Sequence, residues 1–230
     1  NRFEKLFKAN VRKEKDNLEQ KHMDIAASVQ SVIEDVILSL TKNIFKEYGI
    51  KNLCLAGGVA LNCVANGKIL KQGYFKNLWI QPAAGDAGGA IGAAYIVANE
   101  LGETKDRFYM DHAYWGPSFD DSYHEKILSE KKVDLEQEKC QVEYIGDEDE
   151  VCRRTALAIS NGLVTGWFQG RMEWGPRALG NRSILGDPRR ADMKGILNLK
   201  IKRRESFRPF APSILRERVS EWFEEEDDVP

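Results

Sequence analysis

The chain has 230 residues, which is enough for one large domain or two small ones and for a buried core. Its apolar fraction of 42% and charged fraction of 30% are typical of a soluble globular protein. No apolar run approaches the roughly 20 residues that cross a bilayer, and no signal-peptide pattern opens the chain. We therefore expect no membrane span and a cytoplasmic location.

The net charge is only −2, but it is unevenly distributed. From Gly170 to Arg218, thirteen Lys and Arg residues stand against five Asp and Glu residues, so this stretch carries +8 and the remainder −10. A basic island in a mildly acidic chain favours a local anionic ligand over a surface that coats nucleic acid.

Four cysteines occur without the spacing of a redox or zinc motif, and two of them lie inside apolar runs. This usage predicts buried free thiols in a reducing compartment. The cysteines are Cys54, Cys63, Cys140 and Cys152.

The first half of the chain predicts a regular alternation of helices and strands. Apolar residues repeat at three- and four-residue spacing from His22 to Tyr48, which predicts a long amphipathic helix that ends at Gly49. Strand, helix, strand and helix are then expected in that order, which predicts a parallel βαβ unit. Their ranges are 52–58, 59–72, 78–81 and from residue 82 onward.

The second half begins after an irregular stretch, residues 99–122, that we interpret as a crossing between two domains. Helices are predicted near 120–132, 147–161 and 191–200, and a strand is predicted at 163–168.

The first motif, LAGGVALN (Leu55–Asn62), places two glycines where a strand turns into a helix. Gly57 and Gly58 tolerate unusual backbone angles and allow a close approach, and the helix start offers unpaired N–H groups to an anion. A tight corner without a ligand explains the same pattern, because the motif is neither a Walker loop nor a GxGxxG fingerprint.

The second motif, PAAGDAGGAIGAA, has one acid, Asp86, among small residues at the end of the second predicted strand. Ligands gather at this edge of parallel sheets, so Asp86 is a candidate metal ligand or a partner of a sugar hydroxyl. Capping of the following helix is the structural alternative.

The third motif, GRMEWGPRALGNRSILGDP (Gly170–Pro188), is the strongest signal for an anion. Its arginines can donate paired hydrogen bonds to phosphate, its glycines bend the backbone, and further cations follow in IKRRESFRPFAPSIL. A solvated basic face and an RNA-binding surface stay open as alternatives. The candidate residues are Arg171, Arg177, Asn181, Arg182, Ser183, Lys202, Arg203, Arg204 and Arg208.

The histidines and tryptophans are interpreted as packing, hinge or surface residues. His22, His112 and His124 form no metal-ligand spacing, although His112 could join a site at the domain junction. No Ser–His–Asp or Cys–His arrangement can be nominated.

Taken together, these motifs resemble the O-carbamoyltransferases of the nodulation-factor and antibiotic-tailoring family, in the right order from about His22 to Leu215. The resemblance implies an α/β protein of two domains. Residues 1–105 would be the C-terminal part of an actin/sugar-kinase-like carbamoyl-transfer domain. Residues 106–230 would form a threonylcarbamoyl-adenylate-synthase-like domain. We also expect the chain to be a fragment or a processed product of something longer.

The resemblance further implies that carbamoyl phosphate and ATP give carbamoyl-adenylate and pyrophosphate, after which the carbamoyl group passes to a hydroxyl of a sugar or another natural product. Gly57, Gly58 and Asn62 match the nucleotide-contacting turn. The phosphates would be held by the basic candidates named above, with Arg177 and Arg208 as the catalytic cations, because fixed positive charge stabilises the transition state of such a reaction.

Asp86 matches a metal ligand of that family, which implies a divalent ion, Fe(II) or Mg, that polarises the carbamoyl group. The family's metal-binding histidines lie in an HxxxH motif, which is missing from this chain. The expected partners are ATP, carbamoyl phosphate and a hydroxylated acceptor, with a homodimer as an open alternative. A non-catalytic nucleotide-binding regulatory module and an RNA-associated basic protein are the rival functions.

Overall fold

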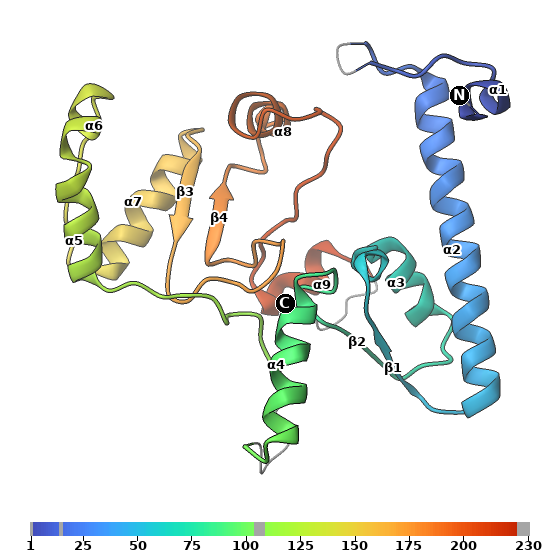
Figure 1. Cartoon of the computed structure of the whole chain (residues 1–230). Helices are drawn as coiled ribbons and strands as arrows, with labels where there is room; N and C mark the ends of the chain where they lie inside the picture. Colours follow the sequence, from blue (N-terminus) through green and yellow to red (C-terminus); the bar gives the residue numbers. More distant parts are fainter. Residues whose placement is uncertain (1, 14–15, 104–108, 225–230) are drawn as a thin grey trace. The chain divides into compact units, whose positions relative to one another are not determined.

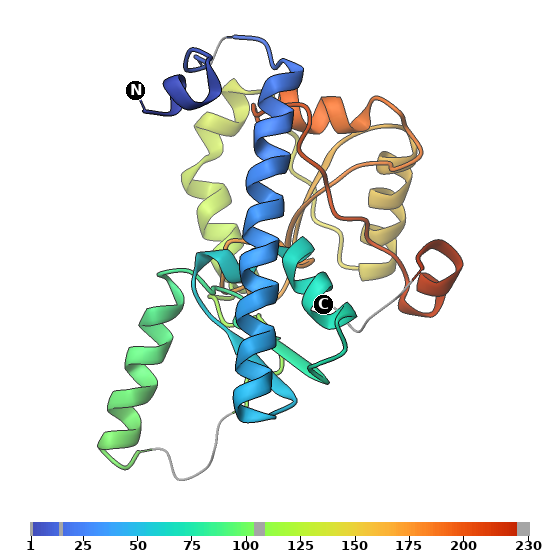
Figure 2. The same cartoon turned by 90° about the vertical axis from the view of Figure 1, so that its right-hand side faces the viewer.

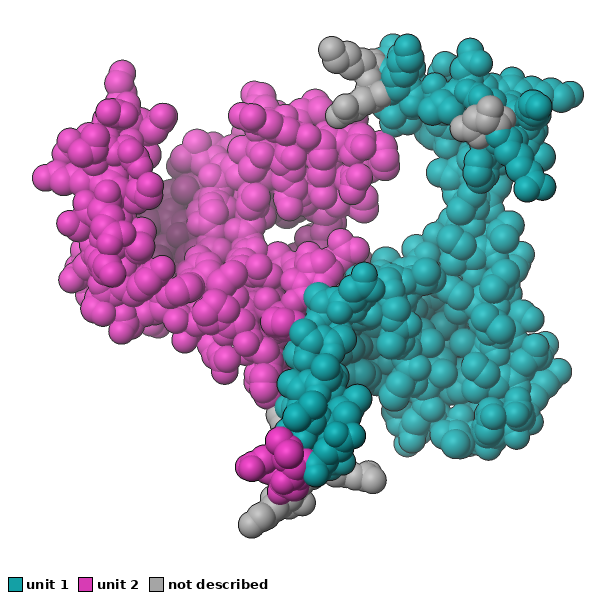
Figure 3. Space-filling model, in the orientation of Figure 1, with its two compact units in different colours: residues 1–100 teal, residues 101–230 magenta. Residues whose placement is uncertain are grey.

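The computed structural model describes residues 2–13, 16–103 and 109–224 (Figure 1). They belong to two compact units, residues 1–100 and residues 101–230, which Figure 3 draws in teal and magenta. Both units combine helices with a small sheet, so the predicted α/β class is confirmed. Among the described residues, no helix combines the length and the apolar character that a membrane span requires.

Unit 1 is built on a parallel pair of strands with helices alongside. The strands pair in register, with Leu53 opposite Leu78, and the connection between them contains a helix, so the predicted βαβ unit is confirmed. Figures 1 and 2 show the long second helix running beside this unit. The elements are α1 (Arg2–Phe7), α2 (Gln20–Tyr48), β1 (Asn52–Leu55), the 3-10 helix η1 (Gly58–Leu61), α3 (Cys63–Lys71), β2 (Asn77–Ile80) and α4 (Gly88–Glu100).

The core of unit 1 lies between α2, α3 and the strands. Leu53, Ile69 and Phe75 are buried at its centre, and the Phe45 ring of α2 packs edge-on against Phe75 with the ring centroids 5.7 Å apart. The helix α2 ends as predicted, because Gly49 adopts the left-handed conformation (φ 65°) that a helix C-terminus commonly requires.

Unit 2 contains the predicted basic island and an antiparallel strand pair, in which Phe168 lies opposite Arg182 and Thr165 opposite Leu185. Asp120 and Asp147 cap the first and third helices by accepting a backbone N–H. The elements are α5 (Asp121–Glu130), α6 (Lys132–Gln137), α7 (Glu148–Ser160), β3 (Thr165–Phe168), β4 (Arg182–Leu185), α8 (Met193–Gly195), the π-helix η2 (Ile196–Ile201), the 3-10 helix η3 (Arg216–Arg218) and α9 (Val219–Trp222).

Several sequence predictions need correction. The continuous helix expected over 59–72 is wrong, because a 3-10 turn precedes Asn62 and α3 begins only at Cys63. The helix expected over 191–200 begins at Met193 and continues as a π-helix to Ile201. The helices α1 and α6 and the strand β4 were not expected. Residues 104–108 of the predicted crossing lie outside the described residues.

The cysteine prediction is wrong about burial. All four cysteines are free thiols, and all four are exposed. Cys54 shows the reason, because successive side chains of a strand point to opposite faces. In β1, Leu53 is buried and the neighbouring Cys54 therefore faces outward.

Candidate functional site

The two glycine-rich turns of unit 1 contact each other beyond the carboxyl ends of the parallel strands. The backbone N–H of Gly57 donates to the carbonyl of Ala84 over 2.7 Å. A Cβ atom built on Gly85 would lie 4.0 Å from the Cα of Gly58. Gly57 has a φ of 98°, a conformation that glycine adopts without strain. The two motifs therefore lie side by side at the carboxyl ends of the parallel strands, which is where ligands bind in parallel sheets.

Asn62 lies at the start of α3, and its side-chain amide is hydrogen-bonded to other groups of the protein. Its Oδ1 accepts the backbone N–H of Ala65 and the side-chain amide of Gln30, both over 3.2 Å. Its Nδ2 donates to Gln30 Oε1 over 2.9 Å. The side chain of this predicted nucleotide contact therefore caps a helix and joins that helix to α2.

A buried carboxylate on α2 strengthens the same junction. Glu34 is buried, and it accepts hydrogen bonds from Lys68 on α3 and from Gln30. The Lys68 ammonium group, followed by the Gln30 amide, lowers the pKa of Glu34 below its ordinary value.

Asp86 lies on the turn before α4, and it is exposed. The described residues contain no group of three or more His, Cys, Asp or Glu side chains that could hold a metal ion. Asp86 can therefore supply one carboxylate to a metal, but the described residues alone do not complete a metal site.

In unit 2, most of the predicted cations are bound by protein groups. Arg171 donates through Nε to the carbonyl of Gly116 (3.1 Å) and through Nη2 to that of Trp115 (3.3 Å). Asn181 Nδ2 donates to the carbonyl of Arg171 over 2.7 Å. These contacts stabilise the motif, so Arg171 and Asn181 have structural partners that the sequence did not reveal.

Arg182 is paired with Glu173, an acid outside the predicted set of site residues. Arg182 Nε lies 2.9 Å from Glu173 Oε2, and the Glu173 side chain is 0% exposed. Burial on its own would raise the pKa of Glu173. The backbone N–H of Leu179 and the Arg182 guanidinium outweigh burial and lower this pKa to about 2. Glu173 is therefore charged at neutral pH.

This depressed pKa predicts an acid-labile motif. A carboxyl group with a pKa of about 2 in the folded state and an ordinary value of 4.5 contributes stability above about pH 4.5 and loses it as the pH falls toward 2. We expect the unfolding free energy of the wild type to exceed that of Glu173→Gln at about pH 6, and the difference to shrink by about pH 3. Urea unfolding followed by tryptophan fluorescence measures both values. A difference that stays constant over this range would contradict the assignment.

Asn198 of η2 is a second buried residue whose hydrogen bonds hold the basic segment, here the part that follows β4. Asn198 is 0% exposed. Its Nδ2 donates to the carbonyls of Ser206 (3.2 Å) and Arg208 (2.8 Å), and its Oδ1 accepts Arg204 Nε (2.7 Å). The Arg204 guanidinium also lies over the Phe210 ring, 4.9 Å from its centroid. One buried amide thus folds residues 198–208 into a compact loop.

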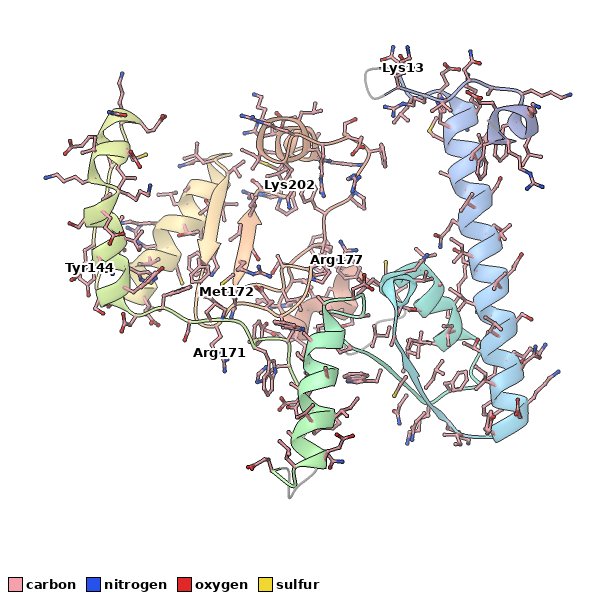
Figure 4. The ribbon with its side chains drawn as sticks, viewed as in Figure 1. Lys13, Tyr144, Arg171, Met172, Arg177 and Lys202 are labelled. Atoms are coloured by element: carbon pink, nitrogen blue, oxygen red, sulfur yellow. The ribbon has the colours of Figure 1, made fainter. Side chains whose placement is uncertain are left out.

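The remaining predicted cations differ in their freedom to bind a ligand. Arg208 pairs with Glu205 over 2.8 Å on the surface. Within the described part of the chain, no hydrogen bond or ion pair engages the exposed side chains of Arg177, Lys202 and Arg203 (Figure 4 labels the first two). Arg203 also has a φ of 47°, which is unusual for a residue other than glycine. These three residues are the cations that an anionic ligand can contact without displacing a protein partner.

Ser183 and His112 complete the predicted set. Ser183 lies in β4 opposite Trp167 of β3. The Nδ1 atom of His112 accepts the backbone N–H of Tyr114 over 3.2 Å, and its ring lies 5.7 Å from that of Trp115. His112 is exposed, and these local contacts agree with the structural or surface role interpreted from the sequence.

Comparisons with known proteins agree with the motifs. Residues 1–95 match the family model for the carbamoyltransferase N-terminus, and residues 156–230 match the model for the carbamoyltransferase C-terminus. The uncharacterized protein sll1178 of Synechocystis is 50% identical over 233 residues, which cover 100% of this chain and 37% of the relative.

Several relatives are nodulation proteins, two of which match 95% of this chain. NolNO of Sinorhizobium fredii is 45% identical over 220 residues, covering 95% of this chain and 31% of the relative. NolO of Bradyrhizobium diazoefficiens is 44% identical over 220 residues, covering 95% of this chain and 39% of the relative. The chain therefore spans between three tenths and two fifths of the length of these relatives. With both family models matched in order, this chain belongs to the carbamoyltransferase family.

Proposed function

We propose that the full-length protein containing this chain is an ATP-dependent O-carbamoyltransferase that works through carbamoyl-adenylate. Water and carbamoyl phosphate give carbamate and phosphate. A carbamate oxygen then bonds to the α-phosphorus of ATP, and the bond to the leaving pyrophosphate breaks. The carbamoyl group next passes to an acceptor hydroxyl, and AMP leaves. Membership of the carbamoyltransferase family is the observation that carries the proposal.

The arrangement of unit 2 supports the first half of this reaction. Adenylate formation brings several negatively charged groups together, so it is accelerated by cations that are fixed before the substrates arrive. Arg177, Lys202 and Arg203 are exposed cations on segments that Glu173 and Asn198 fold from within. We assign the phosphate contacts first to these three residues, and Arg208 joins them when it leaves Glu205.

Unit 1 would supply the transfer half. In this proposal it corresponds to the latter part of an actin/sugar-kinase-like domain, and unit 2 corresponds to a threonylcarbamoyl-adenylate-synthase-like domain. The joined turns of Gly57, Gly58 and Ala84 allow a nucleotide or a sugar to approach the backbone closely. Asp86 would contribute one ligand to a divalent metal, with the other ligands coming from outside the described residues. The acceptor is proposed to be a hydroxylated small molecule, and the location to be the cytoplasm.

The test is the release of pyrophosphate by the full-length protein. Pyrophosphate should form only when ATP and carbamoyl phosphate are both present, because the carbamate that attacks ATP comes from carbamoyl phosphate. A reaction without carbamoyl phosphate is the control, because simple ATP hydrolysis would continue in it. Pyrophosphate release that does not depend on carbamoyl phosphate, or no release at all, would contradict the proposed reaction.

A further inference from the structure

Glu173 differs from every other acid of the described chain that forms an ion pair. Its side chain is 0% exposed, compared with 5% for Asp187 and 8% for Glu34. It lies in the basic segment between β3 and β4, yet it contacts no substrate in the proposed chemistry. A charged group is costly to bury unless its hydrogen bonds are satisfied, so its partners indicate what the burial achieves.

The two oxygens of Glu173 hold the far end of its own loop. Oε1 accepts the backbone N–H groups of Leu179 (2.7 Å), Asn181 (2.8 Å) and Arg182 (3.3 Å). Oε2 accepts Arg182 Nε over 2.9 Å. Arg182 Nη2 returns to the carbonyls of Glu173 (3.1 Å) and Gly175 (3.3 Å). Residues 173–182 are thereby closed into a loop around one carboxylate.

Two glycines permit this closure. Gly175 has a φ of 118° and Gly180 a φ of 112°, conformations that side chains with a Cβ rarely adopt. They bracket Arg177, which is exposed and has no hydrogen bond or ion pair to any described residue. Arg177 therefore stands in the middle of a loop whose two ends are fixed from inside.

The loop is also anchored on its outer side, by the backbone of residues 113–117. Trp174 N–H donates to the carbonyl of Ala113 over 2.6 Å, and Gly116 N–H donates to that of Met172 over 2.8 Å. A Cβ atom on Gly116 would come within 2.8 Å of the Met172 Cβ, so the two backbone segments approach each other more closely than a residue with a side chain would allow. The backbone on both sides of Glu173 is thus held in place by hydrogen bonds.

We propose that Glu173 is the positioning residue of the anion site: it closes residues 173–182 so that Arg177 is presented to the ligand, while Arg182 is retained as a structural cation. Glu173 does not touch the ligand and acts through Arg177. The inference rests on the proposed function only in taking the ligand to be a phosphate-bearing substrate. It goes further by separating two neighbouring arginines into a binding cation and a structural one.

The charge of Glu173 allows a test in which a purely electrostatic role and a positioning role predict opposite changes in anion affinity. Glu173→Gln removes a negative charge near an anion site, so electrostatics alone would strengthen anion binding. Loss of positioning would weaken it, because the Gln amide donates where Arg182 Nε also donates and the loop opens. We therefore expect weaker binding of inorganic pyrophosphate to the full-length protein by calorimetry, by roughly tenfold.

The same substitution in an Arg177→Ala background completes a double-mutant cycle. If Glu173 acts through Arg177, Glu173→Gln changes pyrophosphate affinity by less than about twofold once Arg177 is gone. Equal weakening in both backgrounds would overturn the inference. So would wild-type or tighter binding by Glu173→Gln, or an Arg177→Ala variant that binds pyrophosphate like the wild type.

A second variant covers the case in which Glu173→Gln does not fold. Arg182→Lys preserves the net charge and one donor toward Glu173 Oε2, but it loses the forked contacts to the carbonyls of Glu173 and Gly175. It should weaken pyrophosphate binding only when Arg177 is present, and unchanged affinity would overturn the inference. Pyrophosphate binding is measured without turnover, so it tests the positioning role separately from the reaction. If the double-mutant cycle gives the expected coupling but the protein releases no pyrophosphate, the proposed reaction is rejected and the positioning role is supported.

Discussion

Arg177→Ala is expected to lower kcat/KM for pyrophosphate release by about a hundredfold, which is the loss seen when one preorganised donor is removed from a charged transition state. Arg177 is exposed, and no hydrogen bond or ion pair joins it to the described residues. Its truncation therefore leaves no buried partner unsatisfied. We expect the unfolding free energy to change by less than about 0.5 kcal/mol, so the lost activity reports on the ligand contact.

The matched control for this variant is Arg153→Ala. Arg153 is an exposed arginine of the same unit, located on α7 and paired with Glu150 over 2.7 Å. Surface pairs of this kind contribute about 1 kcal/mol or less, so activity and stability should both stay close to those of the wild type. A comparable loss of activity in the two variants would indicate a general charge effect and would remove Arg177 from the catalytic set.

Asn198→Leu is expected to have the largest effect on stability, about 4 kcal/mol, because it removes three hydrogen bonds that a fully buried amide makes, one of them to a charged group. Leucine branches at the same position as asparagine and is slightly larger, so the substitution leaves no cavity. The carbonyls of Ser206 and Arg208 lose their donor, and Arg204 loses its acceptor. Each group left unsatisfied contributes about 1–3 kcal/mol to the loss.

Urea unfolding measures this effect, with Asn161→Ala as the control. Asn161 is an exposed asparagine at the end of α7, and its truncation should change the unfolding free energy by less than about 0.5 kcal/mol. Asn198→Leu should also weaken pyrophosphate binding, because residues 201–208 lose their central support. Wild-type stability in Asn198→Leu would show that these hydrogen bonds contribute nothing net.

The parts of the fold that were predicted from the sequence are those determined by residues close together in the chain. The helix α2 has an uninterrupted apolar repeat and a glycine at its end, so both its type and its C-terminus could be read from neighbouring residues. The parallel pairing of β1 and β2 follows from a helical connection between two short apolar runs. The glycine pair after β1 marked a turn that the structure contains, with Gly57 at φ 98°.

The parts that were missed depend on which residues meet in three dimensions. Arg182 and Glu173 are nine residues apart, and nothing local shows that this arginine is paired while Arg177 is free. The third motif has only two acids among its arginines, Glu173 and Asp187, and an acid in such a basic segment is a signal for a paired arginine. Asn198 stands between two leucines, and only the folded chain shows that it faces three polar groups. The strand β4 was missed because its pairing with β3 follows a long irregular connection.

The ion pair between the buried Glu173 and Arg182 also constrains how the segment can evolve. Loss of Arg182 alone leaves the buried Glu173 carboxylate without its ion-pair partner, which typically destabilises a protein by about 3–5 kcal/mol, whereas replacing both residues with apolar ones of similar volume is often tolerated. Positions 173 and 182 should therefore change together across related chains. The residue at position 177 is constrained by the ligand instead. It should therefore vary independently of positions 173 and 182 in relatives that bind a different ligand.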